Sequence, residues 1–195
     1  MLERLPDKVK VLKPSGIRKI YDLANKIGYR YNLCLGQPDF DTPDVIKDAV
    51  YRAMKNKKNG YTPNAGIPEL REALADYYRD FYTLDVKPDQ FIITCGACQA
   101  ISTTVHALVG RGDEVIIPDP GFVYYEADVI LAGAKPVPLK LREENGFLYD
   151  IHELEDAISR KTKMIILNYP SNPTGAVMDK KYAEKLADLF RKHRI

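Results

Sequence analysis

The sequence predicts an α/β fold with a mainly parallel sheet. Short apolar runs alternate with amphipathic, helix-like segments through the second half of the chain. Strands that alternate with helices are joined by crossovers, and these make neighbouring strands parallel. The last such segment, residues 179–193, has a helical pattern, and no strand follows it before Ile195. Because a crossover unit ends on a strand, we expect a truncated domain.

Three helices are expected before this alternation begins. Ser15 is a suitable N-cap for the first helix, and Gly28 is its stop signal. Thr42 is expected to cap the second helix, with Pro43 at the first helical position, where proline is favoured. Pro68 opens the third helix in the same way. The second and third helices are predicted to end near Met54 and Phe81.

The alternating segments that follow can be placed from their apolar spacing. A short run such as residues 91–94 fits a buried strand, whereas residues 97–109 repeat their apolar side chains at helical intervals. The predicted strands span residues 91–94, 115–117, 135–139 and 164–167, and the predicted helices span residues 97–109, 122–132, 151–159 and 179–193.

Composition and charge are those of a soluble globular protein. Of its 195 residues, 45% are hydrophobic and 29% are charged. The net charge of +2 provides no footprint for nucleic acid. No apolar run approaches the roughly 20 residues that span a bilayer, and the N-terminus lacks the apolar core of a signal peptide. With three cysteines and no such signal, the sequence predicts reduced thiols and a cytoplasmic location.

The first candidate site lies where an expected strand meets the helix after it. Gly96 and Ala97 are small, so backbone N–H groups at the helix N-terminus can approach a phosphate there, and the helix dipole favours its charge. A tight turn that needs glycine is the alternative. Cys95 and Cys98 have the Cys-x-x-Cys spacing of thioredoxin-like redox pairs, but nothing else in the sequence supports that role. We expect serine at either position to matter little.

Metal binding has no better support. A zinc site needs a second pair of ligands, and Cys34 with three scattered histidines does not provide an obvious one. No metal is therefore expected.

Two further loops follow predicted strands, and ligands bind at strand carboxyl ends in open α/β sheets. Phe122, after Asp119, could stack on a flat heteroaromatic ring for about 1 kcal/mol beyond its burial, although an aromatic residue here also suits the core. Asn172 lies between Pro170 and Pro173, which limit the freedom of its amide. A phosphate cup, a stacking face and an amide donor together suit a planar, phosphorylated cofactor. No Gly-x-Gly-x-x-Gly or Walker-type loop supports nicotinamide or ATP.

Longer motifs occur in a characteristic order. They are residues 35–43 (Leu-Gly-Gln-Pro-Asp-Phe-Asp-Thr-Pro), residues 61–71 (Tyr-Thr-Pro-Asn-Ala-Gly-Ile-Pro-Glu-Leu-Arg), Gly96, residues 120–125 (Pro-Gly-Phe-Val-Tyr-Tyr) and residues 168–175 (Asn-Tyr-Pro-Ser-Asn-Pro-Thr-Gly). Together they resemble the N-terminal half of class I aminotransferases that depend on pyridoxal 5′-phosphate, the fold type I group of aspartate and aromatic aminotransferases. The resemblance implies that residues 1–45 form an N-terminal arm and a small-domain segment. Residues 46–195 would form the first part of a three-layer large domain.

The resemblance also implies roles for individual residues. Gly96, Ala97 and Cys98 would form the phosphate cup through backbone N–H groups, although the family often has Lys, Ser or Thr at the third position. Tyr61 would reach the cofactor phosphate of a partner subunit, which implies a homodimer. Gly36 would bind the substrate carboxylate through its N–H group.

Two more roles concern the cofactor ring. Phe122 would stack on the pyridine ring, at a position often taken by Trp or Tyr. Asn172 would donate to the phenolic oxygen, and the bond before Pro173 is commonly cis in the family, which would direct that amide.

The reaction implied is transamination between an L-amino acid and a 2-oxo acid. The Schiff-base lysine, the aspartate on the pyridinium nitrogen and the arginine on the substrate carboxylate are expected beyond Ile195, so no catalytic residue is assigned in this chain and little activity is expected of it alone. Lys180 and Lys181 begin a helix and are expected to be solvated. The alternatives are another fold type I enzyme, such as a C–S lyase or an aminocyclopropane-carboxylate synthase-like enzyme, and a non-catalytic cofactor-binding or dimerising role.

Overall fold

The chain divides into two units, one formed by Met1–Ser15 with Gly96–Ile195 and the other by Gly16–Cys95. The structure, a computed structural model, describes residues 4–12, 16–31, 33 and 36–195. Ser15, the expected N-cap, and Cys34 lie outside the described residues. The domain boundary expected at residues 45 and 46 stays a prediction.

The first unit contains a parallel sheet of three strands in the order β2-β1-β3. The strands are β1 (Glu114–Asp119), β2 (Lys135–Lys140) and β3 (Thr162–Ile165). The helices are α1 (Asp7–Lys10), α5 (Gly96–Leu108), α6 (Tyr124–Leu131), α7 (Ile151–Ala157) and α8 (Lys180–His193), with a 3₁₀ turn η3 (Glu143–Asn145). The predicted alternation and parallel pairing are confirmed for these three strands.

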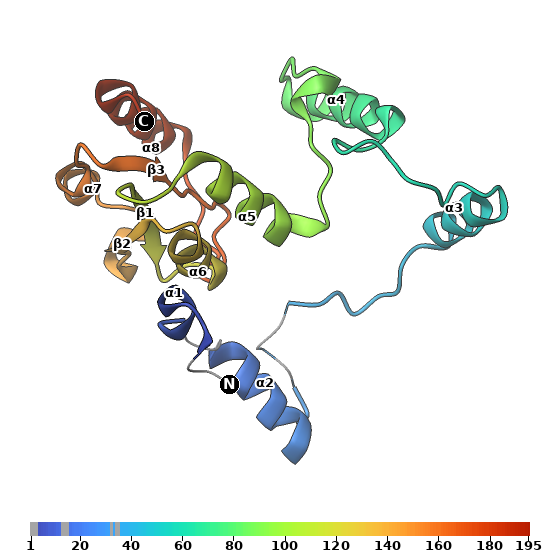
Figure 1. The fold of residues 1–195 in the computed structure, drawn as a ribbon, viewed down its shortest axis with the longest axis horizontal. Coiled ribbons are helices and arrows are strands. Elements are labelled where there is room, and N and C mark those ends of the chain that lie inside the picture. Colours follow the sequence, from blue (N-terminus) through green and yellow to red (C-terminus); the bar gives the residue numbers. More distant parts are fainter. Residues whose placement is uncertain (1–3, 13–15, 32, 34–35) are drawn as a thin grey trace. The chain divides into compact units, whose positions relative to one another are not determined.

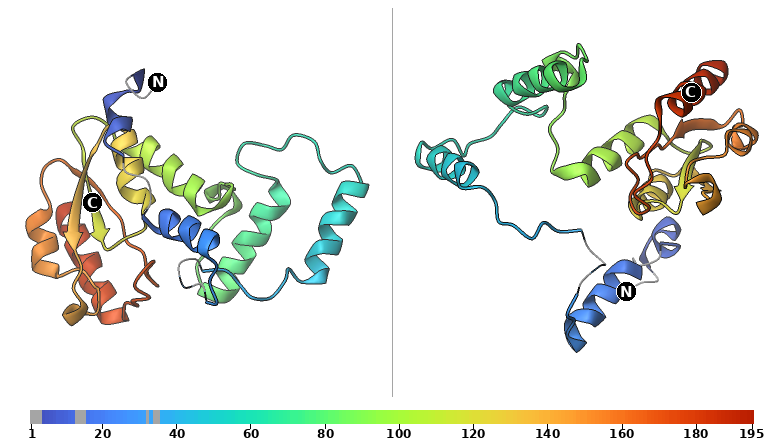
Figure 2. Two further views of the ribbon diagram at one scale, coloured as in Figure 1. Left: turned by 90° about the horizontal axis from the view of Figure 1, so that it is seen from below. Right: turned by 180° about the vertical axis from the view of Figure 1, so that it is seen from behind.

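Helices cover both faces of this sheet, because successive side chains of β1 point to opposite faces. Val115 and Ile117 pack with residues of α5 and α6, whereas Ile116 packs with residues of α7 and α8. Figure 1 shows β1 between these two pairs of helices, and the left view of Figure 2 separates the layers. The three-layer arrangement predicted for the large domain is therefore confirmed in this unit.

Capping aspartates fix where α7 and α8 begin. The Asp150 carboxylate accepts hydrogen bonds from the backbone N–H groups of His152 and Glu153, at 2.9 and 3.1 Å. The Asp179 carboxylate accepts one from the N–H group of Tyr182 at 2.7 Å. Side-chain oxygens at the N-cap satisfy N–H groups that the helix itself leaves unpaired. The predicted starts of both helices are confirmed, although α7 ends at Ala157, before the expected residue 159.

Glu155 connects α7 to the last turn of α8. Its carboxylate lies 2.5 Å from Lys192 Nζ and 3.0 Å from His193 Nε2. The hydrogen bond from Lys192, followed by that from His193, lowers the pKa of Glu155 from 4.5 to about 2. A carboxyl group whose pKa is lower in the folded state stabilises the fold above its unfolded pKa, and this contribution disappears as the pH falls through its folded pKa.

Replacing Glu155 with glutamine is therefore expected to destabilise the chain at pH 7. The difference in unfolding free energy between the wild type and the variant should shrink as the pH falls from about 4.5 to about 2. Urea unfolding of both proteins across this range measures the difference.

Glu184→Gln is the matched control for Glu155→Gln. Glu184 lies on an exposed face of α8, 4.0 Å from Lys180, so its loss should have little effect at any pH. Equal effects of the two substitutions at pH 7 would contradict a special role for Glu155.

The second unit contains helices α2 (Gly16–Ile27), α3 (Asp44–Lys55) and α4 (Pro68–Tyr82) and a 3₁₀ turn η2 (Pro88–Gln90). The helix α2 stops before Gly28, whose φ of 76° lies in the left-handed region. Pro68 occupies the first turn of α4. Both predicted signals are confirmed.

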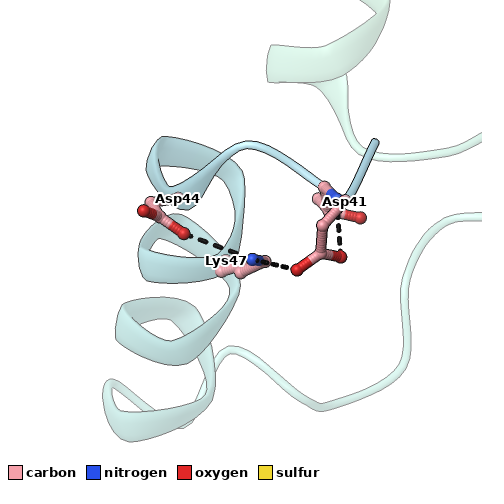
Figure 3. Close-up of polar contacts among 4 residues, drawn as sticks. Asp41, Asp44 and Lys47 are labelled. Atoms are coloured by element: carbon pink, nitrogen blue, oxygen red, sulfur yellow. Dashed lines mark hydrogen bonds and ion pairs between the residues drawn. The ribbon is translucent and has the colours of Figure 1, made fainter. Parts of the chain in front are cut away.

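The start of α3 differs from the prediction. Pro43 rather than Thr42 is the N-cap, and α3 begins at Asp44. Thr42 donates its backbone N–H to Asp41 Oδ1 at 2.7 Å, and Lys47 Nζ lies 2.5 Å from Asp41 Oδ2 and 3.2 Å from Asp44 Oδ1 (Figure 3). The prediction was wrong by one residue because Pro43 has an extended ψ of 140°, so the first helical residue is Asp44.

Residues 91–94 do not form the predicted buried strand. The Ile93 N–H group bonds to the Ala65 carbonyl at 3.0 Å, and the Ile92 side chain is 68% exposed. A strand exists only where its backbone pairs with another strand, and the described strands pair only among themselves. The segment instead packs on a turn, where a Cβ on Gly66 would lie 2.2 Å from Ile93 Cγ1.

Two smaller differences concern α1 and α6. Helix α1 was not predicted, and Lys8 Nζ donates to the Leu131 carbonyl at the end of α6 at 2.8 Å. The helix α6 begins at Tyr124, two residues after its predicted start.

No helix within the described residues is both long enough and apolar enough to cross a membrane.

Candidate active site

The candidate site is formed where β1 and β3 end. Both strands run parallel, so their carboxyl ends lie at one edge of the sheet. The chain leaves β1 at Asp119, whose carbonyl accepts a hydrogen bond from the Leu141 N–H group at 2.7 Å. It leaves β3 through Ile166, whose N–H group donates to the Ile116 carbonyl at 3.0 Å. The loops that follow therefore start from fixed positions at the same edge.

The loop after β3 is closed by its own backbone. The Ser171 N–H donates to the Ala176 carbonyl, and the Gly175 N–H donates to the Ser171 carbonyl, both at 2.8 Å. Gly175 has a φ of 72°, which glycine adopts without steric cost. Asn172 is exposed on this loop, and its bond to Pro173 is cis, as the resemblance implied. The loop thus presents the amide of Asn172 to solvent from a closed turn.

Two tyrosines support this loop, Tyr149 buried and Tyr182 half-buried, and sequence reasoning missed both. Tyr149 Oη donates to the Ile166 carbonyl at 3.1 Å, and Tyr182 Oη donates to the Tyr149 carbonyl. Burial raises the pKa of Tyr149 and that of Tyr182 far above the usual value, so both hydroxyls stay protonated as donors. No periodic pattern predicts these contacts, because they join residues 17 and 33 positions apart.

The loop after β1 turns through a close backbone contact. A Cβ on Gly121 would lie 2.3 Å from the Pro118 carbonyl oxygen, a separation that only glycine permits. The Phe122 side chain is half-buried and packs against the core cluster between the sheet and helices α5 and α6. Its ring centroid lies 5.1 Å from that of Tyr124 and 5.7 Å from that of Tyr125. The turn at Gly121 therefore directs Phe122, and the core holds part of its ring.

The third part of the site is the start of α5. Gly96 has a φ of 76°, and a Cβ there would meet no atom within 4 Å. Ala97 and Cys98 are exposed in the first turn, where the helix does not pair its own N–H groups. Such groups favour an anion.

One core cluster connects these three parts. Ile101 of α5, Phe122 and Ile166 all pack against its buried residues. The start of α5, Phe122 and the loop bearing Asn172 thus extend from one packed cluster within the first unit. Backbone N–H groups, a half-buried aromatic ring and an exposed amide are the donor and stacking groups that a flat, phosphorylated ligand requires.

Tyr61 and Gly36 belong to the second unit. Both are exposed, and a Cβ on Gly36 would meet no atom within 4 Å. Their expected contacts, with a partner subunit's cofactor and with the substrate carboxylate, stay predictions.

Histidines and cysteines have other surroundings. In the described ranges, no group of three or more His, Cys, Asp or Glu residues could hold a metal ion. His106 Nδ1 lies 2.8 Å from the Ser102 carbonyl one turn earlier in α5, and His193 contacts Glu155. Cys95 and Cys98 are both exposed.

The chain is similar to a known family, to characterised proteins and to solved structures. A model of the family described as aminotransferase class I and II matches residues 30–195. Aspartate aminotransferase of Pyrococcus horikoshii is 48% identical over 191 residues, which are 98% of this chain and 49% of that protein. Aromatic-amino-acid aminotransferase 2 of Thermococcus litoralis is 43% identical over 190 residues, which are 97% of this chain and 49% of that protein.

A solved structure extends the similarity to the fold. Aspartate aminotransferase from Thermus thermophilus with maleate superposes with a TM-score of 0.89 at 40% identity, over 97% of this chain and 50% of that one. The chain spans about half the length of the relatives that it matches. A family match over most of the chain, together with this agreement in structure, means that the chain belongs to the class I and II aminotransferases, enzymes of fold type I that use pyridoxal 5′-phosphate.

Proposed function

We propose that the first unit holds pyridoxal 5′-phosphate for transamination between an L-amino acid and a 2-oxo acid. The observation that carries the proposal is the closed loop after β3, which presents Asn172 at the same sheet edge as the turn at Gly121. The chemistry of the groups fits the cofactor, which has a phosphate, a flat ring and an anionic phenolic oxygen.

Each group has a separate task in this proposal. The N–H groups of Gly96, Ala97 and Cys98 hold the phosphate, Phe122 supports the ring, and the Asn172 amide donates to the phenolic oxygen. Because Tyr149 keeps its proton, the hydrogen bond that fixes the base of the Asn172 loop persists at neutral pH. When bound, the cofactor supplies an electron sink for bond breaking at the substrate.

Substitution of Asn172 tests the proposal directly. A hydrogen bond to a charged group contributes about 1.5–3 kcal/mol, so Asn172→Ala should weaken binding of pyridoxal 5′-phosphate by about 10- to 100-fold. Asn172→Asp should weaken it further, since a carboxylate cannot donate and repels the phenolic oxygen. Equilibrium dialysis of the 195-residue chain measures both affinities.

Asn145→Ala is the control for the Asn172 variants. Asn145 is an exposed residue of η3, remote from the three loops in the chain, and its loss should leave the affinity unchanged. Equal affinities of Asn172→Ala, Asn145→Ala and the wild type would refute the role of Asn172.

We further propose that the chain alone has little or no transaminase activity. The lysine that bonds the cofactor is expected outside these 195 residues, and Lys180 is 91% exposed with its Nζ 4.0 Å from Glu184. Borohydride reduction of the loaded chain should therefore leave no cofactor covalently attached. Covalent trapping on any residue, or turnover by the purified chain, would overturn this expectation.

The substrate and assembly are also proposals. Relatives named for aspartate and for aromatic amino acids are similar to this chain, so we propose an amino acid of one of these classes as the donor. We propose a cytoplasmic homodimer in which Tyr61 meets the partner's cofactor phosphate and Gly36 meets the substrate. Release of pyruvate and ammonia from cysteine or its thioethers by the full-length enzyme would instead favour a C–S lyase.

A further inference from the structure

The pairing of β3 with β1 ends at a proline. The Ile166 N–H group, one residue beyond the end of β3, donates to the Ile116 carbonyl at 3.0 Å. In a parallel ladder, the carbonyl of such a residue accepts its next hydrogen bond from the N–H group two residues farther along the neighbouring strand. That residue of β1 is Pro118, which has no N–H group. The Ile166 carbonyl therefore cannot receive this ladder bond from β1.

The hydroxyl of Tyr149 takes the place of the missing donor. Tyr149 Oη donates to the Ile166 carbonyl at 3.1 Å. The Tyr149 side chain is 2% exposed and packs in the cluster that contains Ile116 and Leu154. Burial raises the pKa of Tyr149 far above its usual value, so the hydroxyl stays a donor near neutral pH. A side chain thus fixes the strand end from which the Asn172 loop departs.

Two helices hold the backbone of Tyr149 in turn. Tyr149 immediately precedes Asp150, whose carboxylate caps the start of α7. The Tyr149 carbonyl accepts a hydrogen bond from Tyr182 Oη in the first turn of α8. The Tyr182 N–H group is itself bonded to the capping carboxylate of Asp179 at 2.7 Å. Tyr149 therefore links the starts of α7 and α8 to the end of β3.

The loop after β3 transmits this position to Asn172. Its turn is closed by the hydrogen bonds from Ser171 to the Ala176 carbonyl and from Gly175 to the Ser171 carbonyl, both at 2.8 Å. A turn closed in this way moves mainly at the segment that joins it to the sheet. Because Ile166 begins that segment, the hydrogen bond from Tyr149 limits the directions in which the turn presents its amide.

We propose that Tyr149, held by Tyr182, is a positioning residue for the contact between the Asn172 amide and the phenolic oxygen of pyridoxal 5′-phosphate. The inference rests on the proposed function of Asn172. Tyr149 acts through Asn172 and does not itself touch the cofactor. The N–H groups at the start of α5 belong to another segment, so phosphate binding does not depend on Tyr149.

Tyr149→Phe removes the hydroxyl and keeps the ring in the core. Binding of pyridoxal 5′-phosphate to the 195-residue chain should weaken about two- to tenfold, as expected for the loss of one neutral hydrogen bond. The loss should not exceed that of Asn172→Ala, because Tyr149 acts only through Asn172. Tyr51→Phe, which removes an exposed hydroxyl from α3, should match the wild type. Equilibrium dialysis measures these affinities, and an unchanged affinity of Tyr149→Phe would overturn the proposal.

Two readouts separate positioning from a merely structural role. In the Asn172→Ala background, Tyr149→Phe should cause no further loss of affinity, since the residue through which it acts is already absent. A deoxy analogue of pyridoxal 5′-phosphate that lacks the phenolic oxygen, and inorganic phosphate, should each bind equally well to Tyr149→Phe and to the wild type. Additive losses in the double variant, or weaker binding of either probe, would show general support of the site and would overturn the proposal.

Glu155→Gln is the control for lost stability. It is expected to destabilise the chain at pH 7 through contacts with the last turn of α8, and its affinity for pyridoxal 5′-phosphate should equal that of the wild type. A loss of affinity as large as that of Tyr149→Phe would mean that lost stability weakens binding, against the proposal.

Tyr182→Phe provides a second variant, in case circular dichroism shows that Tyr149→Phe does not fold. It removes the hydrogen bond to the Tyr149 carbonyl and leaves the Tyr149 hydroxyl in place. Binding of pyridoxal 5′-phosphate should again weaken, and the loss should again vanish in the Asn172→Ala background. Unchanged binding by this variant contradicts the hold of Tyr182 on Tyr149 and overturns the proposal.

The outcomes distinguish this inference from the proposed function. If Asn172→Ala weakens binding and the tyrosine variants do not, the positioning role fails and the proposed function stands. If the wild-type chain does not bind pyridoxal 5′-phosphate, or Asn172→Ala binds it as well as the wild type does, the proposed role of Asn172 and the positioning role fail together.

Discussion

Leu154→Ala is expected to lower the free energy of unfolding by about 2–5 kcal/mol. Leu154 of α7 is completely buried in the cluster that also contains Ile116, Tyr149 and Leu186. Its truncation removes apolar contacts and leaves a cavity that a packed cluster cannot fully close. Urea unfolding followed by far-UV circular dichroism measures the loss.

Leu108→Ala provides the control for Leu154. Leu108 is the last residue of α5 and is 56% exposed, so the same change of side chain there should alter stability far less. Because the cavity adjoins Tyr149, Leu154→Ala should also loosen the loop that bears Asn172. A loss below about 1 kcal/mol for Leu154→Ala would contradict the packing of α7 against the sheet.

Gly121→Ala is expected to disrupt the candidate site as well as reduce stability. The new Cβ would lie 2.3 Å from the Pro118 carbonyl oxygen, so the backbone of the loop must shift. Overpacking of this kind costs about 1–3 kcal/mol. Because Phe122 is the next residue, the shift should also displace its ring and weaken binding of pyridoxal 5′-phosphate. Urea unfolding and equilibrium dialysis measure the two effects.

Gly110→Ala separates this contact from a general effect of adding a methyl group. A Cβ on Gly110 would meet no atom within 4 Å, and Gly110 is not among the residues with positive φ. This variant should therefore match the wild type in stability and in cofactor affinity. A Gly121→Ala protein that also matched the wild type would show that the loop after β1 can relax freely.

Local signals in the sequence predicted much of the fold. Pro68 and Asp179 marked helix starts that the structure contains. The first N–H groups of a helix have no partner within the helix; proline has no such group to leave unpaired, and the Asp179 carboxylate accepts a hydrogen bond from one of them. Alternating strands and helices predicted the parallel sheet, because a crossover leaves few other arrangements. Pro43 shows the limit of such signals, since it has an extended ψ of 140° and is the N-cap rather than the first helical residue of α3.

Signals that depend on a distant partner failed. Residues 91–94 have the composition of a strand, but pairing decides whether a strand forms, and Ile93 bonds to Ala65 instead. For the candidate site, the motifs predicted Gly96, Phe122 and Asn172, but the residues that hold these in place were not predictable from them.

The sequence alone thus determined the order of elements, the parallel sheet and the family resemblance, because each depends on residues close together in the chain or on motifs in a fixed order. Only the tertiary structure decided that Tyr149 anchors the base of the Asn172 loop and that Gly121 lies against the Pro118 carbonyl. The first contact joins segments through the folded core, and the second depends on the path of a single turn. Neither spacing nor composition encodes such distances, since they arise only when the whole unit packs.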